Sequence, residues 1–291
     1  MTLDNATVRV LSADDAEPPP RITHDITDRW LVAYAAAVGD KRFAYFDVES
    51  PGGIVAHPVF PACLEWPLVE HGAPGIALSE ATLRRGLHVG QEVEYIAPIR
   101  SGQRLTTTAE LHIAQQRSTA THIATQFHTV DEQGSLLVVT RTHMLYPGVR
   151  LSGSPKPGPD RPVVSATGND LAPIGEFTVD ETNAIIYTEC ARIFNPIHTD
   201  IRVAKAAGLK NTVLHGTETL ARAVSLITSR LPDSPATIGS LSCRFTGIVT
   251  PGARLEVRAA PLRHRSTHFD VRAADGTTPI SNGHLRLTEV R

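Results

Sequence analysis

The sequence predicts an α+β protein built from two copies of one unit. Each half of the chain places helical segments first and alternating, strand-like segments after them, an order that favours a sheet packed over helices. The halves also share a motif at matching positions: residues 95–105 read YIAPIRSGQRL, and residues 245–255 read FTGIVTPGARL. Repetition of this kind indicates a duplicated unit. At 291 residues, the chain is long enough for two modest cores or one large one.

The first unit is expected over residues 21–146, after a proline-rich leader of residues 1–20. Apolar residues at helical spacing predict a helix from about Asp28 to Val38, which a glycine then ends. A second helix is expected near Cys63 to Val69, although three neighbouring prolines blur its limits. From Leu87 onward, polar and apolar residues alternate, which predicts antiparallel strands joined by turns.

Residues 147–173 are rich in Pro, Gly and Ser and lack hydrophobic periodicity, so an extended linker is expected there. The second unit, residues 174–291, repeats the order of the first. Thr178 and Glu181 have the spacing of a capping box, which predicts that a helix begins there. A further helix is expected from Thr217 to about Ser229, and strand-like alternation follows it.

The second unit carries Asn-Pro-Ile-His at residues 195–198 and a His-Gly pair at residues 215–216. Pro196 disfavours the helical conformation at Asn195, so His198 is expected on a loop. A histidine titrates near neutrality and can act as a general base. The first amides of the helix after the His-Gly pair could face a carbonyl oxygen that gains negative charge. Each motif alone is common in turns and on surfaces, but together they favour proton abstraction beside a thioester carbonyl.

This stretch resembles the MaoC-like acyl dehydratases and the type 2, R-specific enoyl-CoA hydratases. Their signature is Tyr or Phe, a short gap, Ser-Gly-Asp-x-Asn-Pro-x-His and a later Leu-His-Gly. The matching residues in this sequence are Tyr187, Asn195, Pro196, His198, Leu214, His215 and Gly216. The resemblance implies a tandem, or double, hot-dog fold, in which each unit is an antiparallel sheet wrapped round a central helix.

In that family, an aspartate and the histidine act together on a water molecule that adds to or leaves an acyl thioester. The aspartate position holds Ile193 in this sequence. The resemblance makes His198 the general base and Asn195 the residue that holds water or substrate. It also implies oxyanion or substrate contacts at Tyr187, His215 and Gly216. The first unit, whose site is degenerate, is implied to shape the acyl pocket.

Three glutamates are candidates for the missing acid. Glu189 lies four residues before Ile193, on roughly the same helix face. Glu65 lies in the first unit's central helix, and acyl-carrier-protein dehydratases of the hot-dog fold resemble such a pairing of a histidine with a neighbouring unit's acid. Glu218, on the second unit's own central helix, is the weakest of the three. Asp40 aligns with Ile193 but would have to reach across a pseudo-twofold axis. A solvated or ion-paired carboxylate is the ordinary alternative for each.

The sequence thus predicts an acyl-thioester hydratase or dehydratase with His198 as its base. One alternative is a hot-dog enzyme diverted to thioester hydrolysis or to a tailoring dehydration or cyclisation. Another is a non-catalytic acyl-CoA-binding subunit whose site has decayed. Ile193 favours the decayed site, whereas the retained motifs oppose it. The isoleucine should also make the surroundings of His198 drier and keep its imidazole neutral.

Composition narrows the expected partners. The formal net charge of −2 gives no reason to expect nucleic-acid binding. The 13 histidines are scattered without metal-site spacing, so neither a metal nor another cofactor is expected beyond the CoA or carrier-protein thioester that carries the substrate. Basic residues that could meet that carrier at the pocket mouth are Arg202, Lys205 and Lys210.

The three cysteines cannot all pair internally, which fits a reducing, cytoplasmic location. The first 20 residues lack the pattern of a signal peptide, and no run reaches the length of a membrane span. The family resemblance also implies that two such chains can pair as a homodimer.

Overall fold

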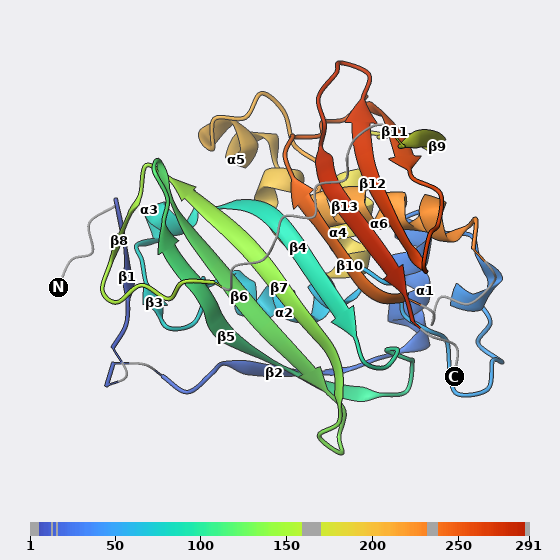
Figure 1. Ribbon diagram of the computed structural model, residues 1–291, viewed down its shortest axis with the longest axis horizontal. Helices are drawn as coiled ribbons and strands as arrows, with labels where there is room; N and C mark the ends of the chain where they lie inside the picture. The colour runs from blue at the N-terminus through green and yellow to red at the C-terminus, as the bar shows by residue number, and fades with distance from the viewer. Residues whose placement is uncertain (1–5, 13, 16, 159–169, 232–237, 289–291) are drawn as a thin grey trace.

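The computed structural model describes residues 6–12, 14–15, 17–158, 170–231 and 238–288. Within them, ten strands form one antiparallel sheet in the order β2-β5-β6-β7-β4-β10-β13-β12-β11-β9 (Figure 1). The strands are β2 (Arg21–Asp25), β4 (Leu87–Tyr95), β5 (Arg104–Gln116), β6 (Ala120–Val130), β7 (Leu136–Pro147), β9 (Ala172–Thr178), β10 (Ile238–Phe245), β11 (Arg254–Ala259), β12 (Ser266–Ala273) and β13 (Ile280–Leu287).

The two units meet at the centre of this sheet, where β4 pairs with β10. Leu241 lies opposite Val93 in that pairing. From the seam outward, the order β4-β7-β6-β5-β2 on one side corresponds to β10-β13-β12-β11-β9 on the other. Each half therefore has the same topology, as the repeated motif predicts. Because β4 and β10 pair directly, the two sheets form one continuous layer.

Helices cover one face of the sheet and lie behind it in Figure 1. They are α1 (Asp28–Ala37) and α2 (Pro61–Val69) in the first unit and α4 (Asn183–Ala191) and α6 (Gly216–Thr228) in the second. Shorter helical turns are η1 (Phe43–Tyr45), α3 (Glu80–Leu83), η2 (Pro196–His198) and α5 (Ile201–Ala206). One apolar core spans both units and contains side chains from all four main helices. No helix among the described residues is both long and apolar enough to cross a membrane.

The helix ends follow from local chemistry. Thr27 caps α1 by accepting a hydrogen bond from the Trp30 amide at 3.3 Å, and Gly39 follows the helix with a φ of +74°. The capping box predicted for the second unit is wrong, because Thr178 is the last residue of β9 and pairs with Arg254. The strand pairing holds Thr178 extended, so α4 begins only at Asn183.

A small sheet, β3-β1-β8, occupies parts of the expected leader and linker. Its strands are β1 (Thr7–Val10), β3 (Ile76–Ala77) and β8 (Arg150–Ser152). Val8 of β1 is fully buried in a second, smaller apolar cluster. Paired backbone therefore extends into the leader and into the linker, of which only the linker is predicted to be extended. The rest of the expected linker, residues 159–169, lies outside the described residues, as do residues 1–5, 13 and 16 of the leader.

Candidate active site

The predicted loop after α4 contains one 3₁₀ turn, η2. Its cap is Asn195, whose side chain accepts a hydrogen bond from the Ile197 amide at 3.3 Å. Pro196 occupies the first position of the turn, where its fixed φ suits a helical start and its missing N–H costs nothing. The Asn-Pro pair therefore sets the backbone that presents His198.

The imidazole of His198 is held by one hydrogen bond, from Nδ1 to the Val213 carbonyl oxygen at 2.8 Å. A carbonyl only accepts hydrogen bonds, so Nδ1 carries the proton, and Nε2 has a free lone pair when the ring is neutral. Burial lowers the pKa of His198 to about 4, against the opposing effect of the Val213 carbonyl. The ring is therefore neutral at pH 7, as a general base requires.

His215 lies directly against this base. The two rings stack with their centroids 3.5 Å apart and their planes 25° from parallel. His215 is buried, and its Nε2 is 3.3 Å from the Thr188 hydroxyl. Burial, followed by the charge of His198, holds the pKa of His215 well below its usual value. His215 is thus a neutral platform under His198.

The same residue caps α6, so the base lies near the N-terminal end of that helix. The first amides of a helix have no partner within it, and the helix dipole is positive at that end. A Cβ added to Gly216 would lie 3.1 Å from Cδ1 of Phe245, so this position requires a close approach between helix and strand. The arrangement can stabilise negative charge beside a neutral imidazole.

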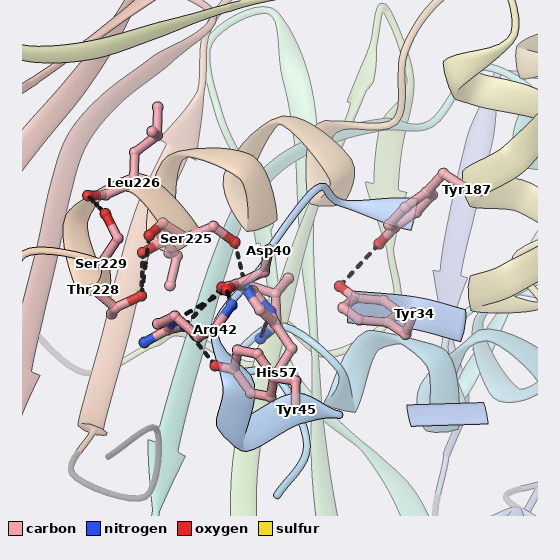
Figure 2. Close-up of polar contacts among 12 residues, drawn as sticks. Tyr34, Asp40, Arg42, Tyr45, His57, Tyr187, Ser225, Leu226, Thr228 and Ser229 are labelled. Carbon is pink, nitrogen blue, oxygen red and sulfur yellow. Dashed lines mark hydrogen bonds and ion pairs between the residues drawn. The ribbon is translucent and has the colours of Figure 1, made fainter. Parts of the chain in front are cut away.

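Tyr187 extends from α4 towards the boundary between the units. Its hydroxyl donates a hydrogen bond to the Thr217 hydroxyl at 3.1 Å and lies 3.4 Å from the Tyr34 hydroxyl of α1. Figure 2 shows the two tyrosines pointing towards one another. The ring centroid of Tyr187 is also 4.9 Å from that of His215. Tyr187 therefore joins the His215 platform to the first unit.

At the family's aspartate position, Ile193 is buried in the shared core and only 5 % exposed. Arg192 precedes it in the left-handed conformation, with a φ of 59°, and its guanidinium lies 3.9 Å from the Trp30 ring. The buried side chain at this position is therefore apolar, where the family signature carries a carboxylate.

The glutamates considered as replacements have other surroundings. Glu189 is exposed on α4. Glu65 is buried between α2 and the sheet, where it accepts a hydrogen bond from Thr140 at 2.5 Å. Glu218 is buried and bound by Arg222 at 2.8 Å, and its Oε2 has no hydrogen-bond partner. Burial raises the pKa of both Glu65 and Glu218 to about 7. No described hydrogen bond or ion pair joins any of the three to His198.

The first unit holds a buried polar cluster at the corresponding place (Figure 2). Arg42 forms paired hydrogen bonds with Asp40, at 2.7 and 3.1 Å, and donates to the Tyr45 hydroxyl at 2.7 Å. Burial alone would raise the pKa of Asp40, but Arg42 outweighs it and lowers that pKa. Tyr45, which aligns with His198, is therefore tied into an ion-paired cluster.

His57, the counterpart of His215, completes this cluster. Its Nδ1 accepts a hydrogen bond from the Val59 amide at 3.1 Å, so Nε2 carries the proton and donates to Ser225 of α6 at 3.1 Å. Both ring nitrogens are engaged, and burial lowers the pKa of His57 to about 3. The cluster is unsuited to base catalysis. Sequence reasoning aligned Asp40 with Ile193 but missed Ser225, because the contact between His57 and Ser225 crosses 168 positions.

The basic residues expected at the pocket mouth lie on α5 and after it. Arg202 is exposed but forms paired hydrogen bonds with Asp200, at 2.6 and 3.0 Å. Lys205 and Lys210 are also exposed. Because Asp200 already neutralises Arg202, the two lysines are the better candidates for contacts with an anionic carrier.

Both halves match dehydratase family models. A model described as a MaoC like domain matches residues 163–280, and one for the FAS1-like dehydratase domain region matches residues 20–141. Each half of the chain therefore carries a dehydratase family domain, MaoC-like in the second half, and the two halves form a double hot-dog fold.

Three proteins illustrate the relationship. The peroxisomal multifunctional enzyme type 2 of Drosophila melanogaster is 24% identical over 278 residues, which cover 90% of this chain but only 46% of that enzyme. The enoyl-CoA hydratase ChsH3 of Mycobacterium tuberculosis is 27% identical over 260 residues, which cover 82% of this chain and 84% of that enzyme. The crystal structure of a MaoC-like dehydratase from Phytophthora capsici superimposes with a TM-score of 0.81 at 21% identity, covering 94% of this chain and 97% of that one.

Proposed function

We propose that this protein is an acyl-thioester hydratase or dehydratase, which catalyses the reversible addition of water to a 2-enoyl thioester. Two relatives, from Mycobacterium tuberculosis and Arabidopsis thaliana, are named as enoyl-CoA hydratases, which supports this reaction class. The observation that carries the proposal is the hydrogen bond from His198 Nδ1 to Val213. It leaves Nε2 as a fixed base near the N-terminal end of α6.

In the hydration direction, Nε2 of His198 accepts a proton from water as the oxygen attacks C3 of the enoyl thioester. Negative charge then develops on the thioester oxygen. The first amides of α6, at Gly216, stabilise this charge. Asn195 is proposed to orient the water or substrate. The proton taken by His198 returns to C2, so the reaction is balanced by His198 alone and needs no further cofactor.

The test is hydration of crotonyl-CoA and of a longer trans-2-enoyl-CoA, followed by loss of absorbance of the conjugated thioester. His198→Ala should lower turnover by at least about a hundredfold, the usual contribution of a positioned base. Because protonated His198 is not a base, wild-type turnover should fall as the pH drops through about 4. Full turnover in His198→Ala would refute this mechanism.

Ile193 favours a second candidate function. A buried isoleucine at the acid position suits a site that binds an acyl thioester without hydrating it, as a diverted enzyme or an acyl-CoA-binding subunit would. A diverted enzyme would catalyse thioester hydrolysis, or a tailoring dehydration or cyclisation, in place of hydration. If wild-type protein shows no hydration but binds acyl-CoA tightly, this second function replaces the first. Pairing of two chains as a homodimer, proposed from the family resemblance, can be checked by sedimentation on the same sample.

A further inference from the structure

A groove of ≈ 670 Å³ lies across the seam between the two units. Its walls come from β4, β5, β6 and β7 of the first unit and from β10 and β13 of the second. In Figure 1, these strands lie side by side at the middle of the sheet. The volume falls within the range typical of small-molecule sites.

The groove opens on the face of the sheet opposite the helices. On β7, Thr140 points towards α2 and donates to Glu65, whereas its neighbour Arg141 lines the groove. Because side chains alternate between the faces of a strand, these two neighbours point to opposite sides of the sheet. Glu92 of β4 also lines the groove and pairs with Arg141 at 3.3 Å. His198, beside the start of α6, is on the helical side. The sheet therefore separates the groove from the candidate active site.

Positive charge gathers in this groove. Four arginines and two glutamates line it, although the whole chain has a net charge of −2. Arg141 pairs with Glu92 at 3.3 Å and so offsets one of the two acids, and Nε2 of His143 lies 3.3 Å from the same carboxylate. Within the described residues, no ion pair to a carboxylate involves the other three arginines, which are Arg117, Arg244 and Arg286.

The positive charges of the groove also act on its histidines. His122 and His143 stack with their planes 19° apart and share a hydrogen bond of 3.1 Å. Burial, together with the charges of His143, Arg117 and Arg244, lowers the pKa of His122 to about 4. The stacked rings offer an aromatic surface next to the guanidinium groups of the groove.

We propose that this groove binds a phosphorylated ligand of nucleotide size, at a site distinct from His198. Guanidinium groups match phosphate oxygens in paired hydrogen bonds, which assigns the phosphates to Arg244, Arg286 and Arg117. The stacked imidazoles of His122 and His143 then face the ring of the base. A free nucleotide and the nucleotide end of a coenzyme A share this chemistry.

The test is isothermal titration calorimetry of the full chain, at low salt, with ADP, 3′,5′-ADP and inorganic phosphate as separate probes. At least one nucleotide should bind at one site per chain, and its affinity should fall as salt is raised. Arg244→Gln and Arg286→Gln should each weaken binding about tenfold or more. The matched control is Arg21→Gln, which removes an exposed arginine from β2 at the far edge of the sheet.

The two nucleotide probes distinguish the two possible ligands. Preference for 3′,5′-ADP assigns the groove to a coenzyme A moiety, whereas preference for ADP assigns it to a free nucleotide. The proposal fails if neither nucleotide binds, if phosphate alone binds, or if the groove variants bind as well as Arg21→Gln. It also fails if His198→Ala abolishes nucleotide binding, since the ligand would then occupy the candidate active site. Because binding is measured without turnover, an inactive enzyme leaves this test unaffected.

Discussion

Ile193 decides the chemistry open to His198. The side chain is buried and apolar, and the described partner of the imidazole is the Val213 carbonyl. A carbonyl fixes the tautomer of the ring but cannot take up a proton, as a carboxylate could. The base is thus oriented without a second acid–base group bonded to it.

Restoring the carboxylate tests this interpretation. Ile193→Asp should fold but lose about 1–3 kcal/mol of unfolding free energy, because a polar group is buried without a partner. We expect its hydration turnover to exceed that of wild type, while Ile193→Asn, of similar size and uncharged, gives no increase. Thermal unfolding and the crotonyl-CoA assay measure the two effects. Equal turnover in the two variants would show that the absent carboxylate does not limit the reaction.

Arg192 adopts a backbone conformation that favours glycine, with its φ of 59°. The left-handed region costs a residue with a Cβ about 1 kcal/mol, and the family signature has glycine here. Arg192→Gly should therefore be more stable than Arg192→Ala by about 1 kcal/mol in chemical denaturation. Both variants lose the contact with Trp30, so their difference isolates the backbone. A more stable Arg192→Ala would contradict the strain argument.

At the scale of elements, α6 contributes residues to the polar contacts of both units. Its N-terminal end carries the His215 platform, and its Ser225 reaches the first unit's cluster, where His57 donates to it (Figure 2). The helix therefore fixes the second unit's site and also satisfies a buried polar group of its neighbour.

Removing that acceptor should destabilise the protein without affecting catalysis. Ser225→Ala leaves the Nε2–H of His57 without its partner, which should lower the free energy of unfolding by about 1–3 kcal/mol. Ser229→Ala, on the same helix, removes an exposed hydroxyl that bonds only locally, to Leu226, and should have little effect. Urea denaturation compares the two, and turnover in both should match wild type. A neutral Ser225→Ala would mean that the His57 contact contributes nothing to folding.

At the scale of the whole molecule, buried titratable groups make stability depend on pH. The pKa of His57 is about 3, the pKa values of His88, His122 and His198 are about 4, and that of His215 lies well below normal, whereas all five titrate near 6.5 when unfolded. Below pH 6.5, the unfolded chain therefore binds protons that the folded chain does not, and each histidine removes up to about 1.4 kcal/mol of stability per pH unit. Glu65 and Glu218, with folded pKa values of about 7, act in the opposite sense between pH 7 and about 4.3.

Stability should therefore fall below pH 6.5 and fall more steeply below about 4.5, where the glutamates no longer compensate. Glu65→Gln removes one compensating group, so its stability should fall faster than that of wild type between pH 6.5 and 4.5. Urea denaturation at a series of pH values measures both slopes. Parallel curves for the two proteins would show that Glu65 ionises normally in the folded state.

The sequence predicted much of this architecture because its signals are local. Apolar spacing placed α1 and α2 within about two residues of their ends, and alternation marked the strands from Leu87 onward. The Asn-Pro pair predicted that His198 follows the end of a helix, and it lies on η2. The predicted capping box failed, because sheet pairing at Thr178 overrides a short-range spacing signal.

By itself, the sequence determined the duplicated unit, the order of its elements and the presence of His198 without an aspartate at position 193. These are properties of composition and spacing along the chain. Only the tertiary structure decided which groups meet: the stacking of His198 on His215, the bond from His57 to Ser225, and the cationic groove where β4 pairs with β10. Each of these depends on contacts between residues far apart in sequence, and no local pattern encodes such contacts.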